Sequence, residues 1–322
     1  VLGEEKMKQV LINFDFPEEY VAQLREKYPE LRFVHTTDKN EMFSYLPDTQ
    51  VLVTFFQCSS DIVDAAPDLE WIQAITAGVD YMPLDMIFDR WIRVTNGRGI
   101  HRIHMAEYAI AVMVMLARNF HIMMENQFRR TWDPSPHQGE IYGATLGIVG
   151  LGEIGEEIAK KAAVFGMRVI GVRRTPAPVE HVETVYSPQD MAAVFEQSDY
   201  VINLLPLTKD TEELIDRRFF DKMSPRACFI NMGRGKSVNE DDLAEALQAG
   251  KIRAAVSDVF YTEPLPETSP LWDLENMIIT PHVCGRSPNY MNRAMEIIDH
   301  NLGVYTTGTG EMINVVSPDA RY

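Results

Sequence analysis

The sequence predicts an α/β protein in which helices cover both faces of parallel sheets. Short apolar runs, each typical of a buried strand, alternate along the chain with longer segments of helical periodicity. At 322 residues the chain is also longer than one hydrophobic core usually organises. We therefore expect two α/β domains.

The first hundred residues are predicted to form the smaller domain. A helix is expected over 18–28, where the pattern is amphipathic. Strands are expected over 9–14, 31–34, 50–56, 71–76 and 91–95. This order suits a small doubly wound, flavodoxin-like sheet. A long helix over 104–120 follows; it is apolar on most sides, so we expect it to be buried between domains or between subunits.

A glycine-rich turn, Gly150-Leu-Gly152-Glu-Ile-Gly155, opens the second half of the predicted fold. A glycine motif alone is usually only a turn. Here it follows an apolar run over 145–149, and a helical pattern over 156–165 and a second apolar run over 167–172 come after it. In this context Gly150 permits the turn, Gly152 lets the backbone approach a pyrophosphate, and Gly155 allows close helix–strand packing. The segment predicts a Rossmann-type dinucleotide-binding domain.

The predicted second strand of this domain ends in Arg173-Arg174-Thr175, where an NAD-binding unit carries an acidic residue. Arginine at this point suits the 2′-phosphate of NADP. The alternative is that two surface arginines simply end a strand. The sequence favours NADP as the cofactor, and NAD remains the alternative.

The α/β alternation continues to the end of the chain. Strands are expected over 200–205, 227–231, 254–259 and 276–280, and helices over 187–197, 216–222 and 239–248. Asn239 with Asp242 predicts a cap, and Gly250 a helix stop. A last helix is expected over 290–305, and the tail after it should return to the first domain. The predicted boundaries are 1–99 with 301–322 for the substrate domain, and 100–300 for the dinucleotide-binding domain.

Composition narrows the class of protein. Hydrophobic residues make up 46% and charged residues 24%, as in ordinary globular enzymes, and the net charge of −17 argues against a nucleic-acid partner. Cys58, Cys228 and Cys284 show no metal-binding spacing, so we expect reduced thiols in a cytoplasmic protein without a bound metal. The longest apolar run, over 109–117, is too short to span a membrane, and no signal-peptide pattern stands at the start.

Three late segments contain the candidates for catalysis. Arg234 stands between two glycines at the end of a predicted strand, Glu263 lies in the segment 257–266, and His282 follows another predicted strand. Ligands of open α/β sheets bind at the carboxyl ends of the strands. Taken singly, the three residues would be a surface cation, a loop charge and a structural histidine.

The ordered set of segments resembles the D-isomer-specific 2-hydroxyacid dehydrogenase family, which includes D-lactate, glyoxylate/hydroxypyruvate and phosphoglycerate dehydrogenases. The resemblance rests on the glycine motif, 205–208, 231–235, 258–266 and Pro281-His282, and it runs from about Trp71 to the C-terminus. It implies hydride transfer between a nicotinamide cofactor and a small 2-keto or D-2-hydroxy acid.

The resemblance also implies the roles of the candidates. His282 would protonate the alkoxide that hydride transfer leaves, because an imidazole titrates near neutrality. Glu263 would orient that imidazole and stabilise its positive charge. Arg234 would hold the substrate carboxylate and polarise the carbonyl. The backbone of Ala77, Gly78 and Val79 would meet the same carboxylate.

The motif and the resemblance together give the expected cofactor contacts. They are Met105, Gly150, Gly152, Glu153, Ile154, Gly155, Arg173, Arg174, Thr175, Leu205, Pro206, Thr211, Met232, Gly233 and Asp258. Asp258 is expected to face the nicotinamide carboxamide. For Met105 and Thr211 a structural role is as consistent with the sequence as a cofactor contact.

The sequence also gives expectations for the oligomeric state, the substrate and the alternative functions. The resemblance implies a homodimer formed through the glycine-motif domain. Two phenylalanines in the segment 53–57 suggest an apolar wall beside the substrate, and 97–104 is more basic than is usual for the family. The alternatives are a cofactor-sensing scaffold similar to corepressors of this fold, and a dehydrogenase for another anion such as phosphite or erythronate phosphate.

Overall fold

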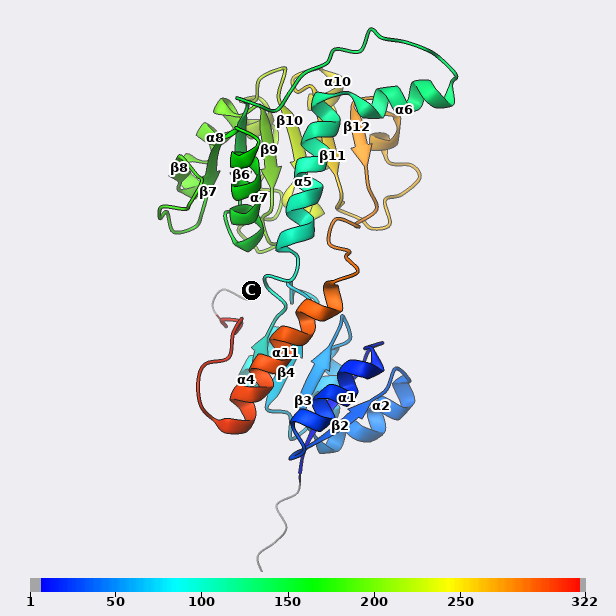
Figure 1. Cartoon of the computed structure of the whole chain (residues 1–322), viewed down its shortest axis with the longest axis vertical. Helices are drawn as coiled ribbons and strands as arrows, with labels where there is room; N and C mark the ends of the chain where they lie inside the picture. Colours follow the sequence, from blue (N-terminus) through cyan, green and yellow to red (C-terminus); the bar gives the residue numbers. More distant parts are fainter. Residues whose placement is uncertain (1–6, 319–322) are drawn as a thin grey trace, which may run out of the picture. The chain divides into compact units, whose positions relative to one another are not determined.

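The chain divides into two units, each with its own sheet. The first unit contains Val1–Ile100 and Ser287–Tyr322, and the second contains His101–Arg286. The computed structural model describes residues 7–318, so the extreme ends of the expected substrate domain, 1–6 and 319–322, lie outside the described residues. Helices pack against the sheet of each unit (Figure 1).

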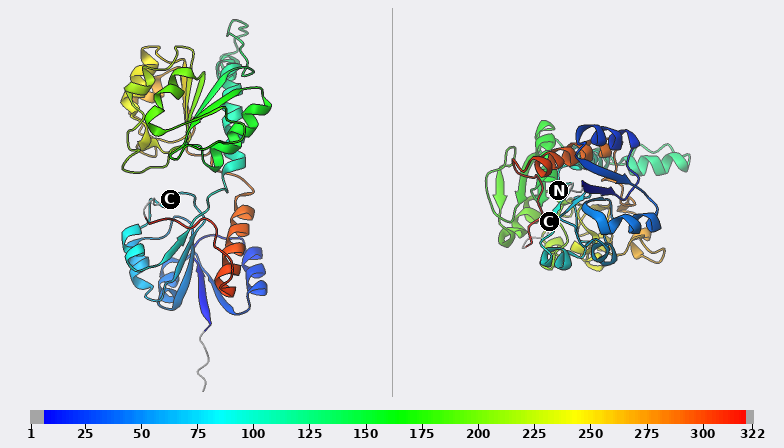
Figure 2. Two further views of the ribbon diagram at one scale, coloured as in Figure 1. Left: turned by 90° about the vertical axis from the view of Figure 1, so that its left-hand side faces the viewer. Right: turned by 90° about the horizontal axis from the view of Figure 1, so that it is seen from below.

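The sheet of the first unit has five parallel strands in the order β2-β1-β3-β4-β5, which is the flavodoxin-like arrangement expected from the sequence. Helices cover both faces of this sheet (Figure 2). The strands are β1 Lys8–Ile12, β2 Leu31–His35, β3 Thr49–Thr54, β4 Trp71–Ala74 and β5 Arg93–Thr95. The helices are α1 Glu18–Lys27, α2 Lys39–Tyr45, α3 Ser60–Ala65, α4 Leu84–Asp89 and α11 Tyr290–Thr307, with a 3₁₀ turn, η1, at Leu46–Asp48.

The last helix, α11, packs entirely within the first unit. Its buried residues, among them Ile298 and Leu302, join the apolar cluster around Val10. The tail then runs beside β5, where the N–H of Val316 donates to the carbonyl of Val94 at 2.9 Å. The expected domain boundary at residue 300 falls inside α11, because the chain returns to the first unit at Ser287, before the helix begins.

The sheet of the second unit has seven parallel strands in the order β12-β11-β10-β9-β6-β7-β8. The strand order reverses between β6 and β9, and ligands of such sheets bind at this switch point. The strands are β6 Thr145–Val149, β7 Arg168–Val172, β8 Thr184–Tyr186, β9 Tyr200–Asn203, β10 Cys228–Asn231, β11 Ala254–Ser257 and β12 Met277–Ile279. The predicted doubly wound fold is confirmed.

Helices of the second unit lie on both faces of its sheet (Figure 2). They are α5 Arg102–Ala117, α6 Phe120–Phe128, α7 Glu153–Val164, α8 Ala192–Gln197, α9 Arg217–Phe220 and α10 Glu240–Gln248, with 3₁₀ turns η2 Pro188–Asp190, η3 Gly235–Ser237 and η4 Pro270–Asp273. The apolar helix expected between domains or subunits is α5, and it belongs to the core of its own unit, together with α7 and β6. The sequence did not predict α6, which buries none of its residues.

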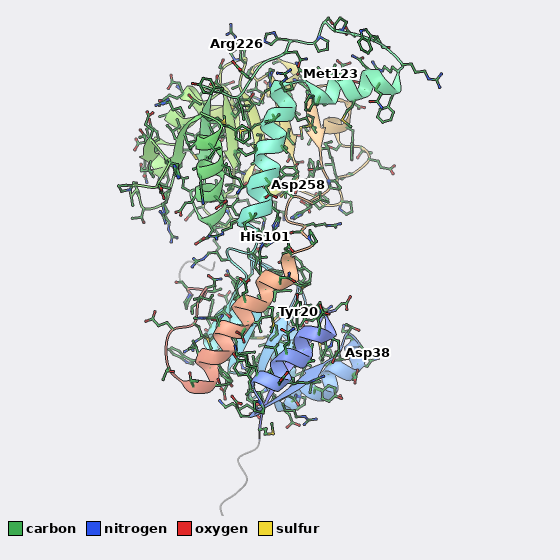
Figure 3. The ribbon with its side chains drawn as sticks, viewed as in Figure 1. Tyr20, Asp38, His101, Met123, Arg226 and Asp258 are labelled. Carbon is green, nitrogen blue, oxygen red and sulfur yellow. The ribbon has the colours of Figure 1, made fainter. Side chains whose placement is uncertain are left out.

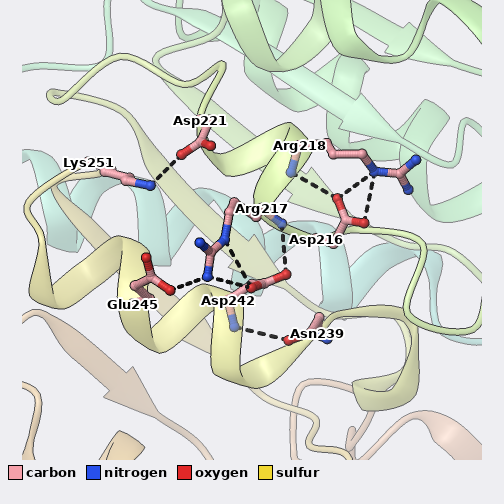
Figure 4. A network of polar contacts seen from close by, with 8 residues as sticks. All are labelled: Asp216, Arg217, Arg218, Asp221, Asn239, Asp242, Glu245 and Lys251. Carbon is pink, nitrogen blue, oxygen red and sulfur yellow. Dashed lines mark hydrogen bonds and ion pairs between the residues drawn. The ribbon is translucent and has the colours of Figure 1, made fainter.

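The capping prediction for α10 is confirmed. The side chain of Asn239 accepts a hydrogen bond from the N–H of Asp242 at 3.0 Å, and Gly250 has a φ of 63° just beyond the helix end. Arg217 at the start of α9 pairs with Asp242 and Glu245 of α10, which ties the two helices together (Figure 4).

Within residues 7–318, no helix is both long and apolar enough to cross a bilayer.

Candidate active site

The glycine turn between β6 and α7 has the geometry that the motif requires. Gly150 adopts a φ of 107°, which side chains rarely tolerate. A Cβ on Gly155 would lie 2.7 Å from the carbonyl oxygen of Gly150, so the helix can approach the turn only without a side chain there. A Cβ on Gly152 would meet no atom within 4 Å, so this part of the backbone faces open space.

The first turn of α7 offers hydrogen-bond donors to an anion. No side chain caps the helix at Gly152. Among residues 7–318, no group accepts a hydrogen bond from the N–H of Glu153, Ile154 or Gly155. Such donors, together with the positive end of the helix dipole, bind phosphates. These residues therefore fit the pyrophosphate of a dinucleotide.

The arginines after β7 lie at the carboxyl end of that strand. Arg173 forms an ion pair with Glu156 of α7 at 3.4 Å, and both side chains are about half exposed. Arg174 and Thr175 are exposed. A phosphate at this edge would compete with Glu156 for the guanidinium of Arg173.

His282 and Glu263 come together as a carboxylate–imidazole pair. The Nδ1 atom of His282 lies 2.7 Å from Oε2 of Glu263, and the other carboxylate oxygen accepts the N–H of Phe260 at 2.9 Å. Both oxygens of Glu263 are thus engaged, which fixes its orientation. The His282 side chain is 52% exposed, and its Nε2 atom is the ring nitrogen on the side opposite the carboxylate bond.

A buried carboxylate fixes the loop that carries His282. Asp258 lies just after β11 (Figure 3). It is fully buried. Its Oδ1 atom accepts from the Thr280 hydroxyl at 2.5 Å and from the N–H of Val283 at 3.0 Å, and its Oδ2 atom accepts from the N–H of Cys284 at 2.9 Å. We expected the carboxylate of Asp258 to face the nicotinamide carboxamide. Both of its oxygens bind the loop that carries His282.

His282 itself has left-handed backbone geometry, with a φ of 52°. This conformation is uncommon for a residue with a side chain and persists where the surroundings fix it. The N–H of His282 donates to the carbonyl of Asp258 at 2.8 Å. Asp258 thus holds the loop through both its backbone and its side chain.

Arg234 lies in the loop between β10 and η3. Its Nη1 atom donates to the carbonyl of Gly233 at 3.1 Å. Next to it, a Cβ on Gly235 would lie 1.9 Å from the backbone carbon of Phe260, so only glycine fits. This contact packs the loop of Arg234 directly against the loop of Glu263.

Two further residues of the site were not predicted from the sequence. The side chain of Glu240, at the start of α10, accepts the N–H of Tyr261 at 2.5 Å. Burial raises the pKa of Glu240, the bond from Tyr261 opposes this effect, and nearby Glu263 adds to it. The Tyr108 hydroxyl lies 2.7 Å from that of Thr280, which contacts Asp258, and burial raises the pKa of Tyr108 to about 12.

Other expected cofactor residues have contacts within the second unit. The Thr211 hydroxyl donates to the carbonyl of Pro206 at 2.6 Å, so it stabilises its own turn. Met105 and Met232 are buried in the core beside the sheet. The N–H of Leu205 donates to the side chain of Asn203 at 3.1 Å.

The proposed substrate loop belongs to the first unit. The side chain of Asn96 donates to the carbonyl of Ala77 at 2.8 Å and fixes the loop after β4. Among the described residues, no group accepts from the N–H of Ala77, Gly78 or Val79. Their N–H groups are therefore hydrogen-bond donors without an acceptor among residues 7–318.

One cavity of about 480 Å³ lies elsewhere in the second unit, beside the start of β11. Its lining includes Leu116, His121, Arg253 and Asn276 but none of the expected catalytic residues.

Comparison with known proteins identifies the family. Residues 110–284 match the model described as D-isomer specific 2-hydroxyacid dehydrogenase, NAD binding domain. The chain belongs to this family, and the resemblance inferred from its ordered segments is confirmed. It is an NAD(P)-dependent oxidoreductase of 2-hydroxy acids and 2-keto acids.

Individual relatives differ in length and in the substrate for which they are named. The chain is 33% identical over 280 residues to a D-3-phosphoglycerate dehydrogenase of Methanocaldococcus jannaschii, a match that covers 86% of this chain and 53% of that protein. It is 30% identical over 313 residues to a glyoxylate reductase of Korarchaeum cryptofilum, with 93% of each chain covered.

One solved structure is also similar to this chain, and the similarity extends over nearly the whole length of both proteins. It is the NADPH-dependent glyoxylate/hydroxypyruvate reductase of Sinorhizobium meliloti, in complex with NADP and sulfate. The TM-score is 0.84 at 28% identity, and the match covers 98% of this chain and 100% of that one.

Replacing Asp258 by Asn tests its role in holding the loop. The amide would place an N–H group against backbone donors of Val283 or Cys284, so the loop of His282 should loosen. We expect kcat to fall about 100-fold and the free energy of unfolding to drop by about 1–3 kcal/mol. Steady-state kinetics and thermal melting measure these effects, with the exposed Asp273→Asn as the control.

The KM for the cofactor separates the two roles considered for Asp258. If Asp258 anchors the loop, this constant should change little in the Asp258→Asn variant. A large rise in the KM for NADPH with an unchanged kcat would contradict the anchoring role and support the contact with the carboxamide.

Proposed function

We propose that the protein is an NADP-preferring reductase of small 2-keto acids, or dehydrogenase of the corresponding D-2-hydroxy acids, with Arg234, Glu263 and His282 as its catalytic residues. The observation that carries this proposal is the 2.7 Å contact between Nδ1 of His282 and the carboxylate of Glu263. It leaves Nε2 directed away from the carboxylate and available to transfer a proton.

Each residue has a distinct part in the proposed mechanism. The nicotinamide, when bound, supplies or accepts the hydride. Arg234 binds the substrate carboxylate through its guanidinium and polarises the neighbouring carbonyl. His282 donates the proton from Nε2 to the carbonyl oxygen as that oxygen gains charge. Glu263 keeps the ring in place and stabilises the imidazolium before the transfer.

The backbone donors of Ala77, Gly78 and Val79 are proposed to bind a substrate carboxylate. Their N–H groups have no acceptor among residues 7–318, which supports this role. With a net charge of −17, the protein as a whole does not attract an anionic substrate. Local hydrogen-bond donors of this kind are therefore required to bind it.

The preference for NADP rests on Arg173, Arg174 and Thr175. They stand after β7, where an NAD-binding unit has an acidic residue. The relative from Sinorhizobium meliloti, described as NADPH-dependent and solved with NADP, supports the same cofactor here.

The proposed cellular location of the protein and the choice against the alternative functions rest on three further observations. We propose a cytoplasmic protein, because Cys58, Cys228 and Cys284 are all buried free thiols. A nucleic-acid partner is not proposed, given the negative charge. The scaffold and the dehydrogenase for another anion are not favoured, because the named relatives are reductases and dehydrogenases of 2-keto and 2-hydroxy acids.

Replacing Glu263 by Gln tests the catalytic pair. The amide keeps the size of the side chain but loses the charge that stabilises the imidazolium, so kcat for reduction of a 2-keto acid should fall about 100-fold. The matched control is Glu267→Gln, which alters an exposed carboxylate of the same loop. Equal kcat values for the two variants would refute the role of Glu263.

Replacing Arg173 and Arg174 together by Ala tests the cofactor preference. Loss of the guanidinium groups should raise the KM for NADPH about 10- to 100-fold and leave the KM for NADH within about threefold. The control is Arg226→Ala, an exposed arginine elsewhere in the second unit. Equal changes in the two Michaelis constants would mean that neither arginine contacts a 2′-phosphate.

We also propose that the protein forms a homodimer through α6 and the segment that follows it. Helix α6 extends from the second unit (Figure 1) and buries none of its residues. The side chains of Phe128 and Trp132 are 82% and 97% exposed. Phe120 and Met124 are also exposed, and their four-residue spacing places them on the same face of α6 as Phe128. An apolar patch of this kind marks a protein–protein contact.

Sedimentation velocity tests the dimer. The chain should sediment as a dimer, and the double variant Phe128→Ser/Trp132→Ser should sediment as a monomer, because about two large apolar anchors account for much of such an interface. The control is Trp91→Ser, which removes an equally exposed tryptophan from the first unit. A monomeric wild-type protein would exclude this proposal.

A further inference from the structure

Aromatic side chains gather at the carboxyl edge of the sheet in the first unit. Phe14 follows β1, Phe55 and Phe56 follow β3, and Tyr81 follows β4. Their rings form a continuous series: the centroids of Phe14 and Phe55 are 6.0 Å apart, those of Phe55 and Phe56 are 4.7 Å apart, and those of Phe56 and Tyr81 are 5.3 Å apart. Tyr290 of α11 lies beside Phe55, at 5.9 Å.

Phe56 is the exposed end of this series. The residue is 63% exposed and has a φ of 60°, a conformation that side chains other than those of Asn, Asp or His rarely adopt. The loop is nevertheless fixed, because the next carbonyl, of Gln57, accepts from Asn13 at 2.9 Å and from Thr54 at 2.8 Å. The backbone of this loop therefore holds the apolar ring of Phe56 in one position, facing solvent.

Tyr81 supports Phe56 from the neighbouring strand. Its hydroxyl lies 3.1 Å from that of Thr76 and also bonds with the backbone of Phe56. Its ring is therefore held in place against Phe56. Together the rings of Phe56 and Tyr81 make a rigid apolar wall.

The wall stands next to the backbone donors of the substrate loop. Strands β3 and β4 are paired neighbours, with Thr54 opposite Ala74, so the residues just beyond them lie side by side at the same edge. Ala77, Gly78 and Val79 follow β4, and Tyr81 belongs to the same loop. A carboxylate held by their N–H groups would leave the rest of the ligand beside Phe56 and Tyr81.

We propose that the preferred substrates are 2-keto acids whose side chain is an aromatic ring, with Phe56 and Tyr81 as the residues that determine this specificity. This inference rests on the proposed function of the protein. The N–H donors bind the carboxylate that all substrates share, and the two rings bind the side chain by stacking. A small substrate such as glyoxylate has no group to place against this wall.

One charged residue at the same edge favours a different ligand. Arg98 lies just beyond β5 and is exposed, and its guanidinium could bind a phosphate on the substrate side chain. A single exposed arginine is a weaker recognition element than a fixed wall of stacked rings. A substrate that carries a phosphate is therefore an outcome of the test rather than the proposal.

The experiment compares kcat/KM for phenylpyruvate, pyruvate, glyoxylate and 3-phosphohydroxypyruvate, each with NADPH and with NADH. We expect phenylpyruvate to exceed pyruvate and glyoxylate by about 10- to 100-fold. The Phe56→Ala variant should lose about tenfold or more of its kcat/KM for phenylpyruvate and stay within about threefold of wild type for pyruvate.

Trp91→Ala provides a matched control. Trp91 is 92% exposed and has a φ of 59°, so it shares the exposure and backbone geometry of Phe56, but it precedes β5 and lies at the opposite edge of the same sheet. This variant should leave all four kcat/KM values unchanged.

The outcomes separate the inference from the proposed function. Equal or better use of pyruvate, glyoxylate or the phosphorylated keto acid would overturn the aromatic preference while leaving the proposed reductase intact. So would a uniform loss for all substrates in Phe56→Ala. No turnover of any of the four keto acids with either cofactor would overturn both proposals.

Discussion

The buried carboxylate of Asp258 is the constraint on which the geometry of the candidate active site depends. A charge without access to water must be matched by donors, and Asp258 obtains them from the segment 280–284, through the Thr280 hydroxyl and the N–H groups of Val283 and Cys284. This requirement wraps the segment around the end of β11. It also accounts for the left-handed backbone of His282, which lies between the anchored residues and is directed to Glu263.

Close backbone packing supplies the second constraint. Gly235 leaves no room for a side chain against Phe260, so the loop of Arg234 and the loop of Glu263 lie in direct contact. Gly155 has the same function at the glycine turn, where it brings α7 against Gly150. The candidate catalytic loops and the turn expected to hold the cofactor are thus positioned by the backbone, which is more rigid than contacts between long side chains.

Much of this arrangement could be predicted from the sequence, because its strongest signals are local. The strand–turn–helix around Gly150 and the apolar runs of the two sheets define the fold class directly. The short helices α2, α3 and α4 lack a periodic pattern long enough to detect, and α6 has no buried face to generate one. The sequence does not say on which core the apolar face of α11 packs, so the boundary expected at residue 300 differs from the division of the structure at Ser287. The position of Glu240 beside Tyr261 depends on tertiary contact alone.

A crystal structure with NADP and a bound 2-hydroxy acid tests the central claim most directly. The account predicts that Nε2 of His282 lies about 3 Å from the 2-hydroxyl oxygen, with Glu263 on Nδ1 and the carboxylate of Asp258 still accepting from Val283 and Cys284. A ring of His282 turned away from the hydroxyl, or a carboxylate of Asp258 released from the loop to bind the cofactor, would contradict it.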